Sequence, residues 1–328
     1  MALATRQTAD TVVARTGPRK RNRWTRYSNR TFYFFVSPWV LGFVGLTVIP
    51  FAYALLVSFT SFDGIYLWRW VGLKNYLDIF HDGDAFYSLG RSLLFTVVAV
   101  PLQVFGGLGL ALLLDRKMHG IGIFRTIFYL PAVVPIVAAA ITWRSVFSRD
   151  TGILNAFIEH LGGPTITWLQ DPTAFYALLI MTLWGIGAGM VISLAGLQGV
   201  PEELKEAARV DGANFWHILR RIILPILSPI LFFQVVLGFI NTIQTLVQPL
   251  LLSETSGVSQ GGWNIPHGNY LYMIHVYEQF LFYQRFGYGS ALLWILFAII
   301  LAITLLVFRT STFWVYYEVE QKRRKGKK

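Results

Sequence analysis

The sequence contains no cysteine among its 328 residues, which excludes a disulfide framework and a thiolate metal site. Charged residues are also scarce, at 14%, whereas 55% of the residues are hydrophobic and 16% are aromatic. Apolar runs of that density cannot be covered in a water-soluble domain. The composition therefore predicts an integral membrane protein.

Acidic residues are absent from the interior of every long apolar run. Because ion-coupled carriers usually need an ionisable group inside the membrane, ion-coupled transport by this chain alone is disfavoured. The sequence also lacks a GxxxxGK(S/T) phosphate-binding motif, and its six histidines show no HExxH spacing, so we interpret them as ordinary loop residues. We expect no catalytic residue, no metal site and no cofactor on this chain. If it takes part in active transport, another subunit hydrolyses the ATP.

Six apolar runs are long enough for the roughly 20 residues that cross a bilayer as a helix. They lie near residues 32–59, 92–114, 124–146, 174–197, 225–252 and 289–309. Since the runs show no alternation of apolar and polar residues, helices are preferred to a β-barrel. We therefore predict an all-α, polytopic membrane protein. Its first run follows a polar tail of about thirty residues and exceeds the apolar stretch of a signal peptide, so we expect it to stay as an anchor.

Arginine and lysine are distributed unevenly between the two sides that six spans define. The N-terminal tail, the 115–125 loop, the 198–224 loop and the C-terminal tail share one side and carry 22 of the 28 cationic residues. The positive-inside rule makes that side cytoplasmic, with both termini there. We interpret residues 1–30 and 314–328 as basic cytoplasmic tails that fix topology, rather than as nucleic-acid-binding segments, and residues 31–313 as the membrane domain.

The cytoplasmic loop 198–224 has an ordered pattern of its own. Pro201 suits the first position of a helix, and the two glutamates that follow it suit the positive end of the helix dipole. We expect this helix to run to about Val210 and to break at Gly212 before a second helix runs toward Pro225. The result is a bent helical pair below the bilayer. From the residues alone, protein docking and contact with lipid headgroups are equally open.

This loop contains a spaced motif that resembles, without a gap, the signature of permease subunits of binding-protein-dependent ABC importers. The motif consists of Glu206-Ala207-Ala208, then Gly212, then Ile222-x-Leu224-Pro225. Other segments are similar to the sugar-transporting, maltose-permease-like branch of that family. These are the WVGLKNY sequence at 70–76, the segment 125–147 with its Leu-Pro pair, and the GILN sequence at 152–155. The resemblance covers roughly residues 30–320.

The resemblance implies a coupling helix whose Glu206, Ala207, Ala208 and Gly212 contact a cytoplasmic ATPase. Ile222, Leu224 and Pro225 would join that helix to the fifth span. It further implies a second permease subunit, two ATPase subunits that bind ATP and Mg, an extracytoplasmic solute-binding protein and a sugar substrate. The location implied is the cytoplasmic membrane of a bacterium or archaeon. Six spans are fewer than in the maltose subunit, which has extra N-terminal helices.

The fifth span carries uncharged polar groups that suit sugar hydroxyls. A period of 100° per residue places these residues and the neighbouring small ones on one face: Gly238, Asn241, Thr242, Thr245, Gln248 and Pro249. Such residues also join helices to one another, so packing is an equal alternative. By position relative to the signature, the resemblance adds Trp184 and Gly185 of the fourth span to the substrate path. Trp184 would offer an aromatic platform to a sugar ring.

Two other functions remain open at the level of sequence. A stand-alone secondary carrier of a small polar solute is opposed by the missing intramembrane acids. An intramembrane enzyme is opposed by the missing polar pairs inside the spans.

Overall fold

The computed structural model describes residues 29–65, 68–116, 118–253, 258–259 and 262–316. The tails predicted at 1–30 and 314–328 lie almost wholly outside these ranges, so that assignment stays a prediction. The chain divides into two compact units, residues 1–53 and 54–328. The first unit contains α1 (Asn29–Phe43) and a π turn, η2 (Val44–Val48), which lead into α2 (Ile49–Ser58), a helix that continues past the boundary at residue 53. The run Arg30–Ser58 is long and apolar enough to cross a membrane.

The second unit is almost entirely helical. Its elements in chain order are α3 (Lys74–Ile79), α4 (Gly83–Leu114), α5 (Ile121–Val133), α6 (Ile136–Val146), α7 (Ile153–His160), α8 (Ala174–Trp184), α9 (Gly187–Gln198), α10 (Glu202–Val210), α11 (Phe215–Ile218), the π turn η3 (Leu219–Ile223), α12 (Leu224–Ile243), α13 (Val247–Leu252), the short antiparallel pair β1 (Val258–Ser259) and β2 (Gly262–Trp263), the 3-10 turn η4 (His267–Asn269), α14 (Tyr272–Leu281) and α15 (Phe286–Trp314). The predicted all-α class is confirmed.

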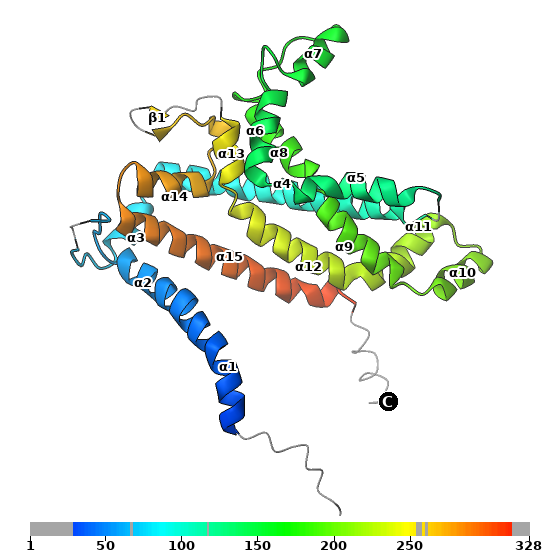
Figure 1. Ribbon diagram of the computed structural model, residues 1–328, viewed down its shortest axis with the longest axis horizontal. Coiled ribbons are helices and arrows are strands. Elements are labelled where there is room, and N and C mark those ends of the chain that lie inside the picture. The colour runs from blue at the N-terminus through cyan, green and yellow to red at the C-terminus, as the bar shows by residue number, and fades with distance from the viewer. Residues whose placement is uncertain (1–28, 66–67, 117, 254–257, 260–261, 317–328) are drawn as a thin grey trace, which may run out of the picture. The chain divides into compact units, whose positions relative to one another are not determined.

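The long helices of the second unit lie side by side. α12 packs between α4 and α15, and α9 packs along α4 (Figure 1). Glycines allow the α4–α9 approach, because a Cβ added at Gly107 would lie 3.0 Å from the backbone of Gly189. The core here comes from all three of α4, α9 and α12, with Leu108, Met190 and Leu227 buried at its centre. α10 lies at one end of these helices, and α3 and α14 lie at the other (Figure 1).

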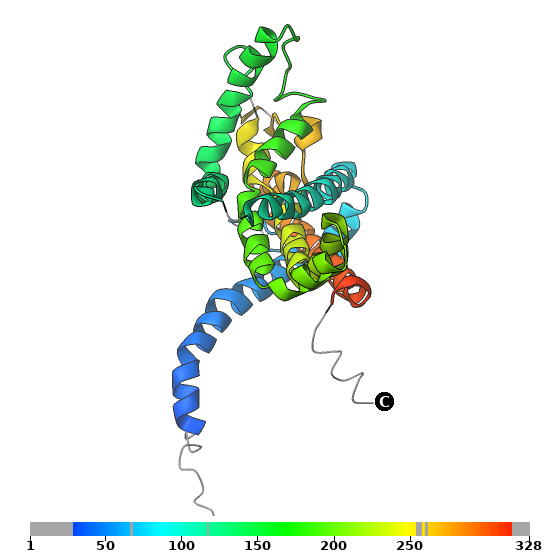
Figure 2. The ribbon, with the colours of Figure 1, turned by 90° about the vertical axis from the view of Figure 1, so that its right-hand side faces the viewer.

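Three of the predicted spans are not continuous helices, and here the sequence-based prediction is wrong. The span predicted at 124–146 is α5 and α6, which meet at a bend of 100°. The span predicted at 174–197 is α8 and α9, bent by 42°, and residues 244–246 separate α12 from α13. In two views α6 and α7 point away from the long helices (Figure 1, Figure 2). The described chain has four helices long enough to cross a membrane, or up to six if each bent pair is one span.

The starts of two spans also differ from the prediction. The second begins at Gly83 rather than near 92, because the Asp82 carboxylate caps α4 by accepting hydrogen bonds from two backbone N–H groups. The fifth begins at Phe215 rather than 225, because the Asn214 side chain caps α11 and the helix then continues through η3 into α12. Both caps are short polar side chains whose partners lie two or three residues further on.

Two segments that carry the family resemblance act as structural clamps. The Asn75 amide of the WVGLKNY segment donates to the carbonyl oxygens of Ser58 and Thr60, both at 2.8 Å. The Asn155 side chain of the GILN segment makes four hydrogen bonds, one to Arg149 in the loop before α7 and three to Ile166 and Trp168 in the loop after it. These asparagines fix loop geometry and lie outside the pockets described below.

Candidate functional site

A pocket of about 230 Å³ lies where the third, fourth and fifth spans break. Its lining consists of Gln103, Pro131, Val134, Ile136, Ala139, Met181, Thr182, Trp184, Gly185, Asn241, Thr242, Thr245 and Gln248. We call it the central pocket. Interrupted helices at the level of the bilayer midplane are where transporters build solute sites, since unwound backbone is tolerated there only beside protein or water.

The three breaks differ in their local geometry. Val134 precedes Pro135 and is extended, with ψ of 129°, because the proline ring disfavours helical geometry in the residue before it. Gly185 ends α8 and separates it from α9. Leu246, with φ of −127°, lies outside helical geometry between α12 and α13. The pocket lies where all three interruptions meet.

Trp184 is the aromatic wall of the central pocket. Its side chain is 38% exposed and meets Trp143 edge to face at 6.0 Å between ring centroids. Trp143 is itself stacked at 5.0 Å on Phe147, which is fully buried. The indole of Trp184 is therefore held by a packed aromatic neighbour while part of its surface stays accessible, as stacking against a sugar ring requires.

The polar lining of the central pocket is uncharged. Thr182 already donates to the Leu178 carbonyl oxygen within its own helix. By contrast, the amides of Gln103, Asn241 and Gln248 make no hydrogen bond to any other residue that the structure describes. Each carboxamide offers both donors and acceptors. The pocket can therefore hydrogen-bond a neutral polyhydroxylated molecule without burying a charge.

Six of the seven residues predicted for the substrate path line this one pocket: Trp184, Gly185, Asn241, Thr242, Thr245 and Gln248. Gly238 does not. It lines an adjoining pocket and faces α4, where an added Cβ would lie 3.1 Å from a methyl carbon of Val100. The prediction of a single helical face is also wrong, because Thr245 lies in the break and Gln248 on α13.

Sequence reasoning missed Gln103 and Thr182. Gln103 is the one carboxamide in the run 92–114, two residues after Pro101, and that isolated polar group was a usable signal. Thr182 gave no such signal, since a threonine bonded to its own helix is common inside membranes.

The loop predicted as a coupling segment begins as expected. α10 runs from Glu202 to Val210, with Pro201 one position earlier than predicted, at the N-cap. Gly212 has φ of +79°, the left-handed geometry that favours glycine, and ends the helix. The predicted glycine break is therefore confirmed.

The surface of α10 is open. Glu206, Ala207 and Gly212 are exposed, whereas Ala208 is half-buried against the core. Glu202 binds Lys205 at 3.1 Å and Arg209 at 3.7 Å. Glu206 makes no ion pair with any described residue. Exposed apolar side chains lie nearby on α10 and α11, namely Leu204, Val210, Phe215 and Trp216.

The second arm of this loop differs from the prediction of a separate helix below the bilayer. α11, η3 and α12 form one helical run from Phe215 to Ile243. Ile222 and Leu224 pack on the buried core of α4, α9 and α12. The Pro225 carbonyl accepts a hydrogen bond from Ser228 Oγ at 2.7 Å, and Ser228 Oγ accepts one from the backbone N–H of Tyr316 at 2.8 Å. These residues therefore anchor the segment rather than form its open surface.

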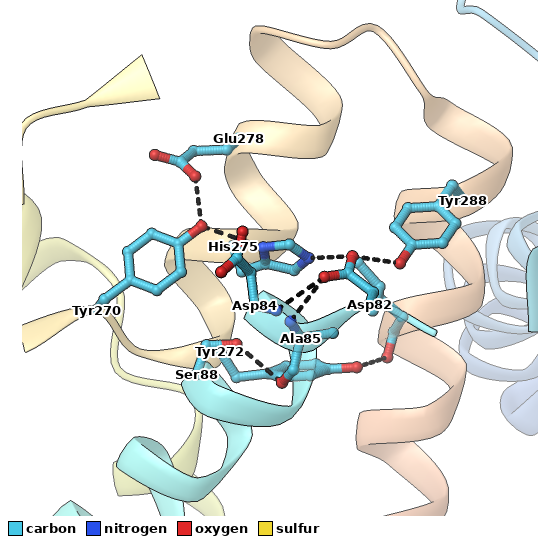
Figure 3. Close-up of polar contacts among 10 residues, drawn as sticks. Asp82, Asp84, Ala85, Ser88, Tyr270, Tyr272, His275, Glu278 and Tyr288 are labelled. Atoms are coloured by element: carbon cyan, nitrogen blue, oxygen red, sulfur yellow. Dashed lines mark hydrogen bonds and ion pairs between the residues drawn. The ribbon is translucent and has the colours of Figure 1, made fainter. Parts of the chain in front are cut away.

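A polar cluster joins α4, α14 and α15 at the opposite end of the bundle (Figure 3). Tyr270 donates to Glu278 at 2.6 Å, and its hydroxyl lies 3.1 Å from His275 Nδ1. Asp82 Oδ2 lies 3.2 Å from His275 Nε2 and accepts from the Tyr288 hydroxyl at 2.6 Å. His275 is 3% exposed, so its interpretation as an ordinary loop residue was wrong.

The cluster favours an ionised Asp82. Burial opposes ionisation, but hydrogen bonds from Tyr288 and from the N–H of Ala85, together with His275, hold the pKa of this carboxyl below its usual value. Burial and the bond to Glu278 raise the pKa of the Tyr270 phenol far above its ordinary value. The phenol therefore stays a donor at any physiological pH.

Comparison with known proteins was made on the whole chain. Residues 80–325 match the family described as the binding-protein-dependent transport system inner membrane component. A probable ABC transporter permease of Bacillus subtilis (strain 168), YesP, is 36% identical over 92% of this chain and 97% of its own length. The trehalose/maltose permease MalF of Thermococcus litoralis is 30% identical over 74% of this chain and 80% of its own length.

Among solved structures, a chain of a bacterial ABC transporter involved in the import of the acidic polysaccharide alginate superimposes with a TM-score of 0.73. It shares 19% identity and covers 87% of this chain and 96% of that one. At this identity the likeness shows that the fold is the same.

Proposed function

The chain belongs to the inner membrane components of binding-protein-dependent transport systems, the permease subunits of ABC importers, and from that premise we propose that its substrate is a sugar or oligosaccharide that crosses at the central pocket. In this proposal a second permease subunit, two ATPase subunits and an extracytoplasmic binding protein complete the importer. ATP and Mg²⁺ are bound by the ATPases, and the α10 end faces the cytoplasm of a bacterium or archaeon.

The central pocket is the observation that carries this proposal. It combines the partly exposed indole of Trp184 with unpaired carboxamides and an uncharged lining. A sugar presents apolar ring faces and many hydroxyls, so an aromatic wall and neutral hydrogen-bonding groups are complementary to it. The substrates in the names of relatives support this class, since they include trehalose and maltose, starch degradation products and lactose.

The position of α10 supports its proposed role in coupling to the ATPase. Its exposed Glu206 and Ala207 and the apolar side chains beside them offer a surface for the ATPase. The helical run that follows, Phe215–Ile243, has 29 residues and spans roughly 43 Å at 1.5 Å per residue. Since Asn241 and Thr242 line the central pocket near its far end, one continuous helix connects the ATPase surface with the substrate. A displacement of α10 is thereby transmitted to the pocket.

Uptake of radiolabelled sugars into proteoliposomes that hold the full complex tests this function. We expect ATP-dependent uptake by the wild type and a strong loss with Trp184→Ala, while Trp39→Ala, at an indole 69% exposed on α1, serves as the control. Glu206→Lys and Gly212→Pro should uncouple ATP hydrolysis from uptake. Uptake by the purified chain without ATPase would instead establish a secondary carrier, and undiminished coupling in both loop variants would refute the role of α10.

A further inference from the structure

A second pocket of about 180 Å³ adjoins the central pocket and shares Gln103 and Gly185 with it. Val100 and Val104 of α4 and Ile186 also line it, and its remaining walls come from two segments, residues 188–192 of α9 and 233–238 of α12. Both segments lie on the α10 side of the breaks at 185–186 and 244–246. The second pocket is therefore displaced from the central pocket toward the proposed cytoplasmic end.

Gln234 places a buried, incompletely bonded carboxamide in this second pocket. Its side chain is 8% exposed, and Nε2 donates to Ser193 Oγ at 3.0 Å. Oε1 accepts no hydrogen bond from any residue that the structure describes. Gly189 leaves the space beside that oxygen open, since an added Cβ there would lie 3.1 Å from Oε1. Oε1 keeps accessible surface where Gln234 lines the pocket, so it can accept a hydrogen bond from a donor that comes from outside the chain.

Gln103 supplies the connection between the two pockets. It is half-buried on α4, lines both cavities, and its amide makes no hydrogen bond to the described part of the chain. A carboxamide can donate and accept at once, as can a pair of neighbouring sugar hydroxyls. A ligand that moves from one cavity to the other therefore exchanges bonds with the same side chain.

We propose that the second pocket is a second hydroxyl-binding subsite for the transported sugar, formed by Gln103 and Gln234 and occupied on the inward side of the central pocket. This rests on the proposed function. The subsite receives either the next ring of an oligosaccharide or the same ring on its way inward. In both cases the Gln234 oxygen accepts from a sugar hydroxyl, and the Gln103 amide binds an adjacent one.

The absence of cysteine from the chain provides a direct test. Gln103→Cys and Gln234→Cys are placed one at a time in the full complex, and their alkylation by a small hydrophilic thiol reagent is followed on this chain. The probe is whichever of maltose, trehalose or lactose the wild-type complex takes up best. We expect both cysteines to react and saturating sugar to slow both reactions several-fold, whereas Gln244→Cys, an exposed position outside both pockets, reacts at the same rate with and without sugar.

A second experiment measures sugar uptake by complexes that carry Gln103→Met, Gln234→Met or Gly189→Ala. Loss of a neutral hydrogen bond should slow uptake about two- to tenfold in each glutamine variant. Gly189→Ala fills the space beside Oε1 and keeps the Ser193 bond, so it should slow uptake without loss of folding. ATP hydrolysis stimulated by the loaded binding protein should persist in all three. Gln244→Met should behave as wild type.

The outcomes separate the two proposals. Cysteines that react without protection by sugar, or glutamine variants with wild-type uptake, would show that the second pocket holds only water or is a packing void, and would overturn the inference. A wild-type complex that imports no sugar would overturn the proposed function itself. Protection of both cysteines together with slowed uptake supports the subsite.

Discussion

The hydrogen bond from Tyr288 to Asp82 allows a quantitative prediction for Tyr288→Phe. Asp82 Oδ1 caps α4 by accepting from the N–H groups of Asp84 and Ala85, both at 3.0 Å, while Oδ2 accepts from Tyr288 at 2.6 Å. A hydrogen bond to a charged group contributes about 1.5–3 kcal/mol. Because the Asp82 side chain is 21% exposed and water can replace part of the bond, we take the lower half of that range.

At about 2–4 °C per kcal/mol for a chain of a few hundred residues, that loss of stability predicts a fall in the unfolding temperature of roughly 3–9 °C. The pH dependence gives a sharper criterion. The folded-state pKa of Asp82 is depressed, so its contribution is present above the unfolded pKa and is lost as pH falls through the folded pKa. Removing the Tyr288 hydroxyl raises the folded pKa. The deficit of the variant should therefore be largest at neutral pH and shrink in acid.

The assay is thermal unfolding of the full-length chain in detergent, followed by tryptophan fluorescence at pH 7.5 and near pH 4. Tyr129→Phe is the matched control, because Tyr129 is 43% exposed and makes no hydrogen bond to the described part of the chain. A deficit that stays constant between the two pH values, or unfolding temperatures within 1 °C of each other at neutral pH, would contradict the assignment of this bond to an ionised Asp82.

Three further substitutions give simple expectations. Gly187→Ala puts a Cβ 1.9 Å from the Phe128 carbonyl oxygen, so it should push α5 away from α9 and lower the unfolding temperature by several degrees. Gly109→Ala is the control, since nothing lies within 4 Å of its added Cβ and the unfolding temperature should not fall. Gly212→Ala, at φ of +79°, should cost about 1–2 kcal/mol locally and lower the ratio of sugar moved to ATP hydrolysed, measured in proteoliposomes. Asn155→Ala removes four hydrogen bonds and should make the loops on both sides of α7 more sensitive to limited proteolysis; an unchanged cleavage rate would refute the role of Asn155 in holding these loops.

Local signals in the sequence predicted local structure well. Pro201 and Gly212 bound a helix because proline suits a helix start and glycine suits a left-handed end, and both effects act within a few residues. The break at Pro135 was also visible in principle, since a proline constrains the residue before it. It was missed because length and hydropathy alone satisfied the criterion for a span.

Tertiary features were less accessible. Position relative to the family signature added Trp184 and Gly185 to the predicted pocket. The helical period predicted its polar residues Asn241, Thr242, Thr245 and Gln248, but it wrongly placed Gly238 with them and assumed a helix through Thr245. Gln103 lies on a helix distant in sequence, and only packing brings it to the same pocket. His275 is buried for the same reason, since its partner Asp82 lies 193 residues away.

The π turn at Leu219–Ile223 has a geometric consequence for the whole importer. Its closing bond runs from the N–H of Leu224 to the Leu219 carbonyl, and Pro225 follows directly, as Pro50 follows a π turn at Val44–Val48. Such a turn holds one residue more than an α turn, and each residue of an α-helix advances the azimuth by about 100°. The π turn takes one residue more than an α turn to complete a revolution, so it absorbs that residue and keeps the phase between Phe215, near the proposed ATPase surface, and Asn241 in the pocket. Deleting one residue within 219–223 would therefore give an ordinary α turn and leave the two surfaces in phase, whereas deleting one residue from the regular part of α12 would rotate one surface relative to the other by about 100°.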